Sequence, residues 1–326
     1  MVKVGLIGCG FMGAMHANCY KNIEGVEVVA FSDIRREKAE ELAKGSNAKI
    51  YGDGKDLIEN ADVDVIDICL PTFLHAEYAL LAMDKAKYVF VEKPVSLTEE
   101  EAAAMMKKAE QTGANVQVGQ VIRFWDEYVE LKKIVESGKY GKVINANFRR
   151  LSPRPTWGWK NWLLDGKLSG GAAQDLHIHD TDYVLSLFGK PEKFYSVKNV
   201  SGEENSYINT LMLYKDFVVS VEGTWDLPAT RAFEATFRVV FEKATVENAG
   251  GKFTLYTDGK AEEIKIEKKQ LKGGVEGGNI SDLGGYYNEL VYLTDRVKAN
   301  GKVERATLRE AAESLKFVLG ESGFHA

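Results

Sequence analysis

The sequence predicts an α/β protein, in which a doubly wound parallel sheet is followed by an α+β domain whose sheet is mostly antiparallel. Three observations predict this order. Short β-branched runs alternate with helical segments in the first part of the chain, which is typical of strands buried between two helical layers. A glycine-rich turn joins the first strand to the first helix. Later in the chain, strands follow one another through short turns, as they do in antiparallel sheets.

Composition limits the class of protein. The chain has 326 residues, 45% hydrophobic and 28% charged, which suffices for two domains of ordinary size. Its net charge of −6, without a basic block, argues against nucleic acid or a membrane as the partner. No apolar run reaches the roughly 18 residues that cross a bilayer, and the N-terminus lacks the pattern of a signal peptide. The three scattered cysteines indicate reduced thiols, so we expect a cytoplasmic protein.

The first strand, Val2–Ile7, runs into the turn Gly8-Cys9-Gly10-Phe11-Met12-Gly13. This spacing fits the G-x-G-x-x-G dinucleotide fingerprint. The three glycines are expected to allow a tight turn, close approach of a pyrophosphate and close packing of helix on strand. The following helix, expected over 14–22, directs its free N–H groups at the phosphates. The turn therefore predicts a nucleotide-binding domain of the Rossmann type.

The second strand, Val26–Ser32, ends at Asp33. An acid at this place can accept hydrogen bonds from a ribose 2′-hydroxyl, which favours NAD. The alternative is that Asp33 only caps the next helix. Arg35 and Arg36 keep NADP open, because an arginine nearby can accommodate a 2′-phosphate. We expect NAD, with NADP as the alternative.

The rest of the first domain continues the alternation. The expected helices cover 36–43, 55–60, 74–85 and 98–112, and the expected strands cover 48–51, the run from 63 to Pro71, 88–91 and 115–118. Thr98 and Glu101 have the spacing of a capping box. Ligands bind outside the carboxyl ends of parallel strands, so five loops should surround one crevice. These loops contain residues 8–12, 33, 70–72, 92–94 and 119–123.

Two of these loops carry side chains suited to catalysis or binding. His75, after Pro71-Thr72, begins a helix near the crevice; it contacts the cofactor or is simply a partly exposed residue at a helix start. In Glu92-Lys93-Pro94, the proline disfavours helix at Lys93 and holds it extended. Lys93 could hydrogen-bond a substrate hydroxyl, stabilise negative charge or relay a proton. The alternative is that Lys93 is an ordinary charged residue at the end of a strand, without a role in catalysis or binding.

Together, the glycine turn, Pro71-Thr72 followed by His75, and Glu92-Lys93-Pro94 resemble the glucose–fructose oxidoreductase/inositol dehydrogenase (Gfo/Idh/MocA) family. The resemblance continues through Gln120 and Arg123-Phe124 and covers essentially the whole chain. It implies a dinucleotide-binding Rossmann domain over 1–122 and a substrate-binding and oligomerisation domain over 123–326. The family has a large open sheet in the second domain, which implies a homodimer or homotetramer formed through that sheet.

In the second domain, we expect a helix over 127–136 and a strand over 142–151. The irregular stretch 152–168 contains Trp157, Trp159 and Trp162, which could line a substrate pocket or form a satellite core. The later strands are expected at 193–200, 207–214, 217–225, 232–241, 252–256 and 262–267, and the last helices at 286–298 and 307–319.

The stretch from Ser169 to Asp182 introduces a helix that should end at Gly189. Asp175 and His179 are four residues apart and share one face of a helix, so both can reach one substrate. His177 points to the other side and is expected to support packing. A metal site of His177, His179 and Asp175 is the alternative, but the two histidines diverge on a helix and no metal is expected. In the resembled family a lysine and an Asp-x-x-x-His pair form the catalytic constellation, which Lys93, Asp175 and His179 match.

We therefore expect an NAD(P)-dependent dehydrogenase that transfers a hydride between a secondary alcohol of a sugar, inositol or related polyol and nicotinamide. His179 would accept the hydroxyl proton, because the ordinary pKa of histidine lies nearest neutrality. Arg123, Trp162 and, by the resemblance, Tyr286 are expected substrate contacts beside Lys93, Asp175 and His179. The expected cofactor contacts are Gly8, Gly10, Phe11, Met12, Gly13, Asp33, Arg35, Leu70, Pro71, Thr72, His75, Glu92, Lys93 and Gln120.

Two other classes of function remain. A nucleotide-binding regulator of the same fold would bind NAD(P) without turnover, and any alcohol-dependent reduction of NAD would exclude it. A metal-dependent hydrolase built on the His-x-His pair would contain bound zinc or manganese.

Overall fold

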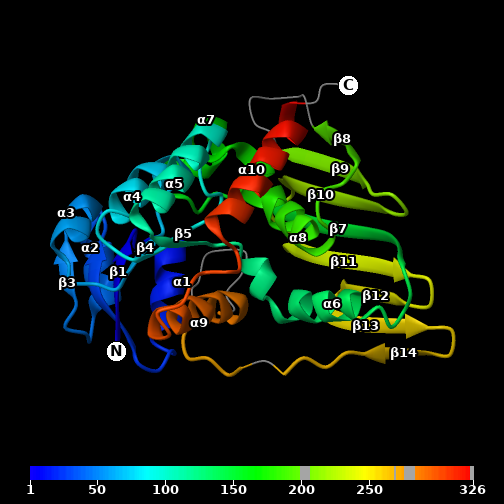
Figure 1. Cartoon of the computed structure of the whole chain (residues 1–326), viewed down its shortest axis with the longest axis horizontal. Coiled ribbons are helices and arrows are strands. Elements are labelled where there is room, and N and C mark those ends of the chain that lie inside the picture. The colour runs from blue at the N-terminus through cyan, green and yellow to red at the C-terminus, as the bar shows by residue number, and fades with distance from the viewer. Residues whose placement is uncertain (199–205, 268, 275–282, 324–326) are drawn as a thin grey trace. The chain divides into compact units, whose positions relative to one another are not determined.

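The computed structural model describes residues 1–198, 206–267, 269–274 and 283–323 (Figure 1). These residues form two compact units. The first contains 1–121, 157–162 and the described part of 270–315, and the second contains 122–156, the described part of 163–269, and 316–323. No described helix is both long and apolar enough to cross a membrane.

The first unit contains a six-stranded parallel sheet in the order β3-β2-β1-β4-β5-β6, which confirms the predicted doubly wound sheet. The strands are β1 (Val2–Ile7), β2 (Val26–Ser32), β3 (Lys49–Tyr51), β4 (Val65–Ile68), β5 (Tyr88–Val91) and β6 (Asn115–Val118). The strand order reverses between β1 and β4, and such a switch point is where parallel sheets bind nucleotides at their carboxyl edge.

Helices accompany this sheet. They are α1 (Phe11–Tyr20), α2 (Arg36–Ala43), α3 (Gly54–Asn60), α4 (His75–Ala82), α5 (Glu99–Thr112), α9 (Gly284–Lys298) and the start of α10 (Leu308–Gly323). The capping box of Thr98 and Glu101 is present at the start of α5. α1 packs against α9.

Two helices of this unit, α1 and α4, differ from the expectation by three residues at one end, α1 at its start and α4 at its end, Ala82. α1 begins at Phe11 rather than Ala14, because the extended residue Gly10 serves as its N-cap. The first helical N–H groups therefore belong to the glycine turn itself. The helix expected over 74–85 is shorter: a 3₁₀ turn, Thr72–Leu74, follows Pro71, and α4 starts at His75.

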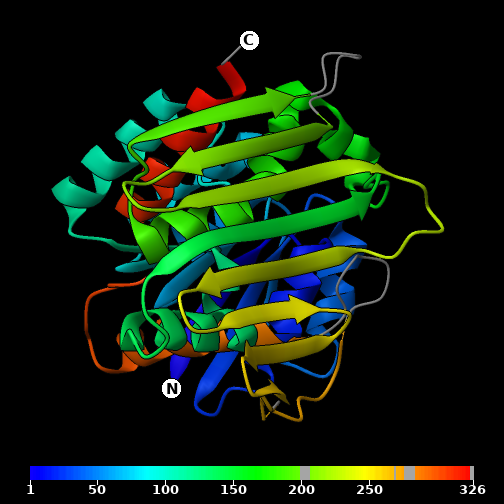
Figure 2. The ribbon, with the colours of Figure 1, turned by 90° about the vertical axis from the view of Figure 1, so that its right-hand side faces the viewer.

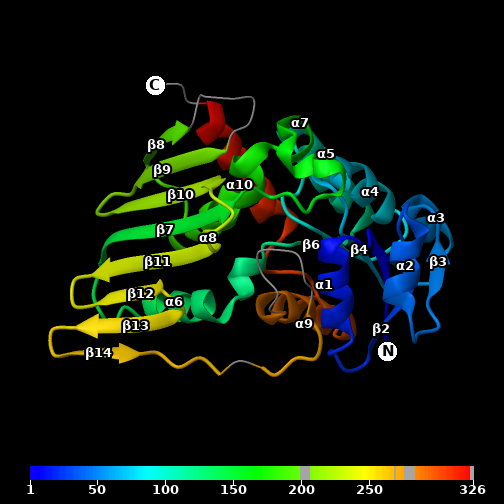
Figure 3. The same cartoon turned by 180° about the vertical axis from the view of Figure 1, so that it is seen from behind.

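The second unit contains an eight-stranded sheet in the order β14-β13-β12-β11-β7-β10-β9-β8, which the labels of Figure 3 follow from one edge to the other. Its strands are β7 (Val143–Pro153), β8 (Lys193–Lys198), β9 (Tyr207–Leu213), β10 (Val218–Leu227), β11 (Glu234–Phe241), β12 (Thr245–Ala249), β13 (Lys252–Thr257) and β14 (Lys260–Glu263). All neighbours pair antiparallel except β7 and β10, which are parallel. The predicted, mostly antiparallel sheet is therefore confirmed.

Some strands of this sheet were predicted wrongly. β12 was not expected, because the polar residues Glu247 and Asn248 interrupt its apolar pattern. β14 lies at 260–263 rather than 262–267, because it forms a hairpin with β13 in which Thr257 pairs with Lys260. The expected end of β8 at 199–200 lies outside the described residues.

One face of this sheet is packed by α6 (Asp126–Ser137), α8 (Ile178–Phe188) and the end of α10, whose Phe317 contacts Phe194 of β8. Tyr128 of α6 stacks edge-on against Tyr183 of α8 and Phe237 of β11, with ring centroids 4.8 and 5.0 Å apart. Such aromatic contacts add to the burial that holds α6 and α8 on the sheet.

The segment before α8 is less regular than one helix. It consists of a 3₁₀ segment (Trp159–Leu164), α7 (Gly166–Ser169) and a single π-helical turn (Ala173–His177) that leads into α8. A left-handed glycine, Gly170, ends α7. The single helix expected from Ser169 to Phe188 is thus corrected to a π turn followed by α8. Wide π turns occur frequently at functional sites.

Candidate active site

The glycine turn of the first unit has the geometry of a phosphate cradle. A Cβ atom on Gly8, whose φ is +92°, would lie 2.4 Å from the carbonyl oxygen of Cys69, and one on Gly13 would lie 1.8 Å from that of Gly8. Only glycine fits these two positions. A Cβ on Gly10 would meet nothing within 4 Å, so this position faces open space beside the start of α1. The three glycines have the environments that dinucleotide binding requires.

Asp33 connects the end of β2 to this turn. Its Oδ2 accepts the backbone N–H of Cys9 at 2.8 Å, and its Oδ1 accepts the N–H and Nε–H of Arg35 at 2.8 and 3.3 Å. Each carboxylate oxygen can accept two hydrogen bonds, so Oδ2 retains capacity for a ribose hydroxyl. The guanidinium of Arg35 also lies over the ring of Trp159, 5.8 Å from its centroid. Arg35 is therefore engaged with Asp33 and Trp159.

Two buried side chains at the same edge of the sheet lack hydrogen-bond partners among the described residues. They are Thr72, after β4, whose Oγ1 is unpaired, and Gln120, after β6, whose amide oxygen and nitrogen are both unpaired. A buried polar group without a partner is costly. The polar groups of a bound nucleotide would satisfy these atoms, so the residues of this edge fit a dinucleotide.

Lys93 lies in the turn after β5, and its peptide bond to Pro94 is cis. Its backbone N–H donates to Oε2 of Glu92 at 3.1 Å, and its side chain is half-buried. The predicted cofactor contact His75 is buried, with Nδ1 2.7 Å from the carbonyl oxygen of Pro94 and Nε2 2.7 Å from that of Leu70. Burial lowers the pKa of His75, and a neutral ring donates to only one of these carbonyls. The His75 ring therefore lies between the carbonyl of Leu70 and that of Pro94 and hydrogen-bonds to one of them.

In the second unit, Asp175 lies in the π turn and His179 in the first turn of α8. Both are half-buried, whereas Leu176, His177, Ile178 and Asp180 between and beside them are buried. A Cβ on Gly223 of β10 would lie 3.0 Å from Cβ of His177, so the helix packs tightly on the strand there. Asp175 and His179 are thus the accessible ionisable groups of this stretch.

His177 has a different environment from His179. Its Nε2 lies 3.3 Å from Oε2 of Glu321, and both side chains are fully buried. A histidine held inside the unit by a carboxylate has a packing role, as the sequence predicts for His177.

The predicted substrate contacts have varied surroundings. Arg123 is buried and forms two hydrogen bonds with the carboxylate of Asp182, Nε–Oδ2 at 2.6 Å and Nη2–Oδ1 at 2.7 Å. The Asp182 carboxylate thus accepts hydrogen bonds from the N–H groups on one edge of the Arg123 guanidinium. Trp162 is half-buried and belongs to the first unit, as does Tyr286, which is 8% exposed in the first turn of α9. Their contacts with substrate stay predictions.

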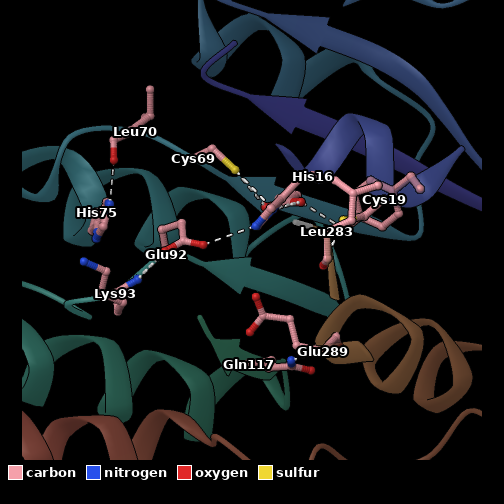
Figure 4. Close-up of polar contacts among 12 residues, drawn as sticks. His16, Cys19, Cys69, Leu70, His75, Glu92, Lys93, Gln117, Leu283 and Glu289 are labelled. Carbon is pink, nitrogen blue, oxygen red and sulfur yellow. Dashed lines mark hydrogen bonds and ion pairs between the residues drawn. The ribbon is translucent and has the colours of Figure 1, made fainter. Parts of the chain in front are cut away.

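Sequence reasoning missed a buried ionisable cluster of the first unit, which consists of His16, Asp67, Cys69, Glu92 and Glu289. Figure 4 labels His16, Cys69, Glu92 and Glu289 of this cluster. His16 Nδ1 lies 2.8 Å from Asp67 Oδ2, and its Nε2 lies 3.2 Å from Glu92 Oε1. The Tyr20 hydroxyl donates to Asp67 at 2.9 Å. The sequence feature that could have indicated this cluster is Asp67, a charged residue within the apolar run of β4.

Burial and charge set the protonation of this cluster. Burial alone would lower the pKa of His16, but the carboxylate of Asp67, with Cys69 and the hydrogen bonds to both, raises it well above its usual value. Burial and then the charge of Glu92 raise the pKa of Glu289 well above its usual range. Both shifts favour the protonated forms, the imidazolium of His16 and the neutral acid of Glu289.

The same cluster supplies the described side chains whose donor atoms could approach a metal. The two sets are His16, Asp67 and Cys69, and His16, Glu92 and Glu289, with donor atoms within 4.8 Å of one another in each set. Asp175, His177 and His179 do not form such a set among the described residues.

Comparison with protein families gives two matches. Residues 2–120 match the Gfo/Idh/MocA model described as an oxidoreductase family with an NAD-binding Rossmann fold. Residues 128–247 match the model of the Gfo/Idh/MocA C-terminal domain.

Individual relatives agree with these matches. The chain is 31% identical over 193 residues to myo-inositol 2-dehydrogenase of Thermotoga maritima, covering 58% of this chain and 55% of that one. It is 30% identical over 214 residues to inositol 2-dehydrogenase of Salmonella typhimurium, covering 64% and 61%. The matches thus span little more than half the length of these relatives. An Agrobacterium radiobacter oxidoreductase, solved with NAD⁺, L-tartaric acid and magnesium, has the same fold, with a TM-score of 0.85 at 18% identity over 98% of this chain and 94% of that one.

Proposed function

Since the chain belongs to the Gfo/Idh/MocA oxidoreductase family, we propose that it is an NAD-dependent dehydrogenase acting on a secondary alcohol of a sugar, inositol or related polyol. One observation carries this proposal. The glycine cradle after β1 and the Lys93 turn after β5 are at the same edge of one parallel sheet, where β1, β4 and β5 are neighbours. The names of the two inositol dehydrogenases support a polyol as the substrate.

Three side chains would act on the substrate. NAD, when bound, accepts a hydride from the carbinol carbon. The ammonium of Lys93 donates a hydrogen bond to the reacting oxygen and stabilises the negative charge that develops on it. His179 accepts the hydroxyl proton on a ring nitrogen, and Asp175 accepts a hydrogen bond from a neighbouring hydroxyl or orients the imidazole. The proposal requires Lys93 and His179, which belong to different units, to reach the same carbinol.

The cofactor would be held by the cradle and by Asp33. The start of α1 donates N–H groups to the pyrophosphate, and Oδ2 of Asp33 accepts from the ribose 2′-hydroxyl. A 2′-phosphate would meet the negative charge of Asp33, and Arg35 is already paired with that carboxylate. NAD is therefore favoured over NADP.

The test is reduced-nicotinamide absorbance with a panel of inositols, aldoses and sugar acids, using NAD and NADP separately. His179→Asn and Lys93→Met should each lower kcat by about 100-fold or more on the best substrate, while NAD still binds. Lys107→Met, at an exposed lysine of α5, is the matched control and should retain activity. Binding of NAD without turnover of any panel member would favour the regulator instead.

The face of the eight-stranded sheet opposite α6 and α8 supports a second part of the proposal, a homodimer or homotetramer. Figure 2 views this sheet face-on. Tyr195, Val197 and Leu211, on the neighbouring strands β8 and β9, share this face by the strand register and are 41–65% exposed. Exposed apolar side chains of this kind mark protein interfaces. Mass determination in solution tests the oligomer, and Val197→Glu with Leu211→Glu should shift it to the monomer.

We also propose the cytoplasm as its location. The cysteines Cys9, Cys19 and Cys69 are all buried and form no disulfide, which suits a reducing compartment. Fractionation of cells that express the protein tests this.

A further inference from the structure

His16 connects the glycine cradle to the Lys93 turn. It lies in the second turn of α1, directly after the cradle, and its imidazole is fully buried. Nδ1 faces Asp67 of β4, and Nε2 faces Glu92, the residue before Lys93 (Figure 4). One imidazole thereby contacts side chains from two neighbouring strands of the sheet, Asp67 within β4 and Glu92 directly after β5.

The carboxylate of Glu92 has little freedom. Its Oε1 faces His16, while its Oε2 accepts the backbone N–H of Lys93 at 3.1 Å. A Cβ on Gly119 would lie 2.9 Å from Oε1, so the carboxylate fills the space that this glycine leaves. The orientation of the Glu92 carboxylate therefore restrains the peptide from which the Lys93 side chain projects.

Stability does not explain this arrangement. Removing charged groups from water costs several kcal/mol per ion, and a well-packed apolar group is often as stable in their place. Asp67, which holds the other side of His16, is itself fixed by the Tyr20 hydroxyl at 2.9 Å. Glu289 of α9 points its carboxyl group toward Glu92 and His16 (Figure 4). Such a costly, well-oriented group of charges directly behind Lys93 indicates a role in placing that lysine.

We propose that His16 is a positioning residue for Lys93: its ion pair with Glu92 fixes the carboxylate that holds the Lys93 backbone, and so directs the lysine side chain at the reacting oxygen. The proposal rests on the proposed dehydrogenase reaction, in which Lys93 contacts that oxygen. The test also decides against the alternative, a divalent metal held by His16, Glu92 and Glu289 with Asp67 orienting the histidine.

The test compares His16→Gln with Tyr20→Phe. Both variants remove a partner of Asp67 within the buried cluster, but only His16→Gln removes the contact with Glu92. Three quantities are measured: the Kd of NAD, kcat on the best substrate, and the acylation rate of the Lys93 amine relative to that of exposed Lys107, followed by peptide mass spectrometry. Metal content of the wild-type protein is measured by elemental analysis.

We expect His16→Gln to lower kcat by about 10- to 100-fold and to change the relative acylation rate of Lys93, with the Kd of NAD within about threefold of wild type. Tyr20→Phe should change neither kcat nor acylation beyond about twofold. Equal effects of the two variants would mean a general structural role and overturn the proposal. So would a stoichiometric divalent metal that His16→Gln releases.

The positioning role can still be tested if His16→Gln does not fold or if no substrate is found. If His16→Gln does not fold, the double variant His16→Gln/Asp67→Asn leaves no unpaired Asp67 charge and takes its place, with Tyr20→Phe/Asp67→Asn as its control. If the wild-type protein turns over no panel member, the dehydrogenase proposal fails. The acylation rates of Lys93 in the variants then still support or overturn the positioning role, because they require no substrate.

Discussion

A Cβ atom on Gly13 would lie 1.8 Å from the carbonyl oxygen of Gly8, whereas one on Gly10 would meet nothing within 4 Å. The two glycines stand three residues apart in the same turn, but they have opposite reasons for being glycine. Gly13 allows α1 to pack on the end of β1. Gly10 leaves space at the start of α1 that a ligand can use.

Replacing each glycine by alanine should therefore give different losses. Gly13→Ala forces backbone to move and should lower the free energy of unfolding by about 3 kcal/mol. Gly10→Ala, at φ −76° and an extended ψ, should fold with nearly wild-type stability but weaken NAD binding by about tenfold or more. Urea unfolding and cofactor titration measure the two effects. Equal NAD affinity in Gly10→Ala and wild type would contradict a pyrophosphate at this position.

Asp33 should determine the preference between the two nicotinamide cofactors. Asp33→Ser replaces the charged carboxylate acceptor for a ribose hydroxyl by a weaker neutral one, removes the charge that would repel a 2′-phosphate, and frees Arg35 from its ion pair. The Kd of NAD should rise about tenfold, and the ratio of NADP to NAD affinity should increase. Asp53→Ser is the control: Asp53 caps α3 through the N–H of Lys55 and accepts the hydroxyl of Tyr78, and since it is not an expected cofactor contact, its replacement should leave that ratio unchanged.

Much of the fold follows from local sequence signals. β1, β2, α2, β5 and β6 have the bounds that apolar and helical patterns predict, because these elements are bracketed by glycine, proline or polar turns. The predicted start of α1 was wrong because Gly10 acts as the N-cap. Sequence rules for helix starts give more weight to Ser, Thr, Asp and Asn at the N-cap position. The π turn at Ala173–His177 has no signal in side-chain periodicity, since it adds one residue to an otherwise helical segment.

The candidate site was predictable only where its residues form short motifs. The residues of the glycine cradle, those of the Lys93 turn and those of the Asp175–His179 pair each lie within a few positions of one another in the sequence. The cluster around His16 joins positions 16, 67, 92 and 289, and no local pattern connects residues so far apart. A charge in a buried strand, such as Asp67, indicates that partners exist but does not identify them.

The buried pair of Arg150 and Asp180 should dominate the stability of the second unit. Arg150 is 2% exposed and Asp180 fully buried, with Nε–Oδ2 at 2.6 Å. Arg150→Met leaves the Asp180 charge without this partner, and should cost about 3–5 kcal/mol of unfolding free energy. In contrast, Arg36→Met breaks an exposed pair with Glu40 and should cost less than about 0.5 kcal/mol. A similar small loss for both variants in urea unfolding would contradict the prediction.

Glu289 should make stability depend on pH. Burial and the charge of Glu92 raise its folded-state pKa well above the unfolded value of 4.5, so above pH 4.5 the folded protein binds more protons than the unfolded chain. The stability from this group is fully present below pH 4.5 and is lost as the pH rises through the folded pKa. His16 contributes in the same direction above 6.5, because its folded pKa is also raised.

Glu289→Gln isolates this contribution, because the amide resembles the protonated carboxyl group and does not titrate. The variant should match wild type near pH 4.5 and become progressively more stable than wild type as the pH rises, with no such trend for Glu110→Gln at an exposed site on α5. The difference in unfolding free energy between each variant and wild type, measured at several pH values, removes the contribution of His16, which wild type and variants share. A constant difference for Glu289→Gln across this range would mean that Glu289 titrates alike in the folded and unfolded chain, and that the charge of Glu92 does not act on it.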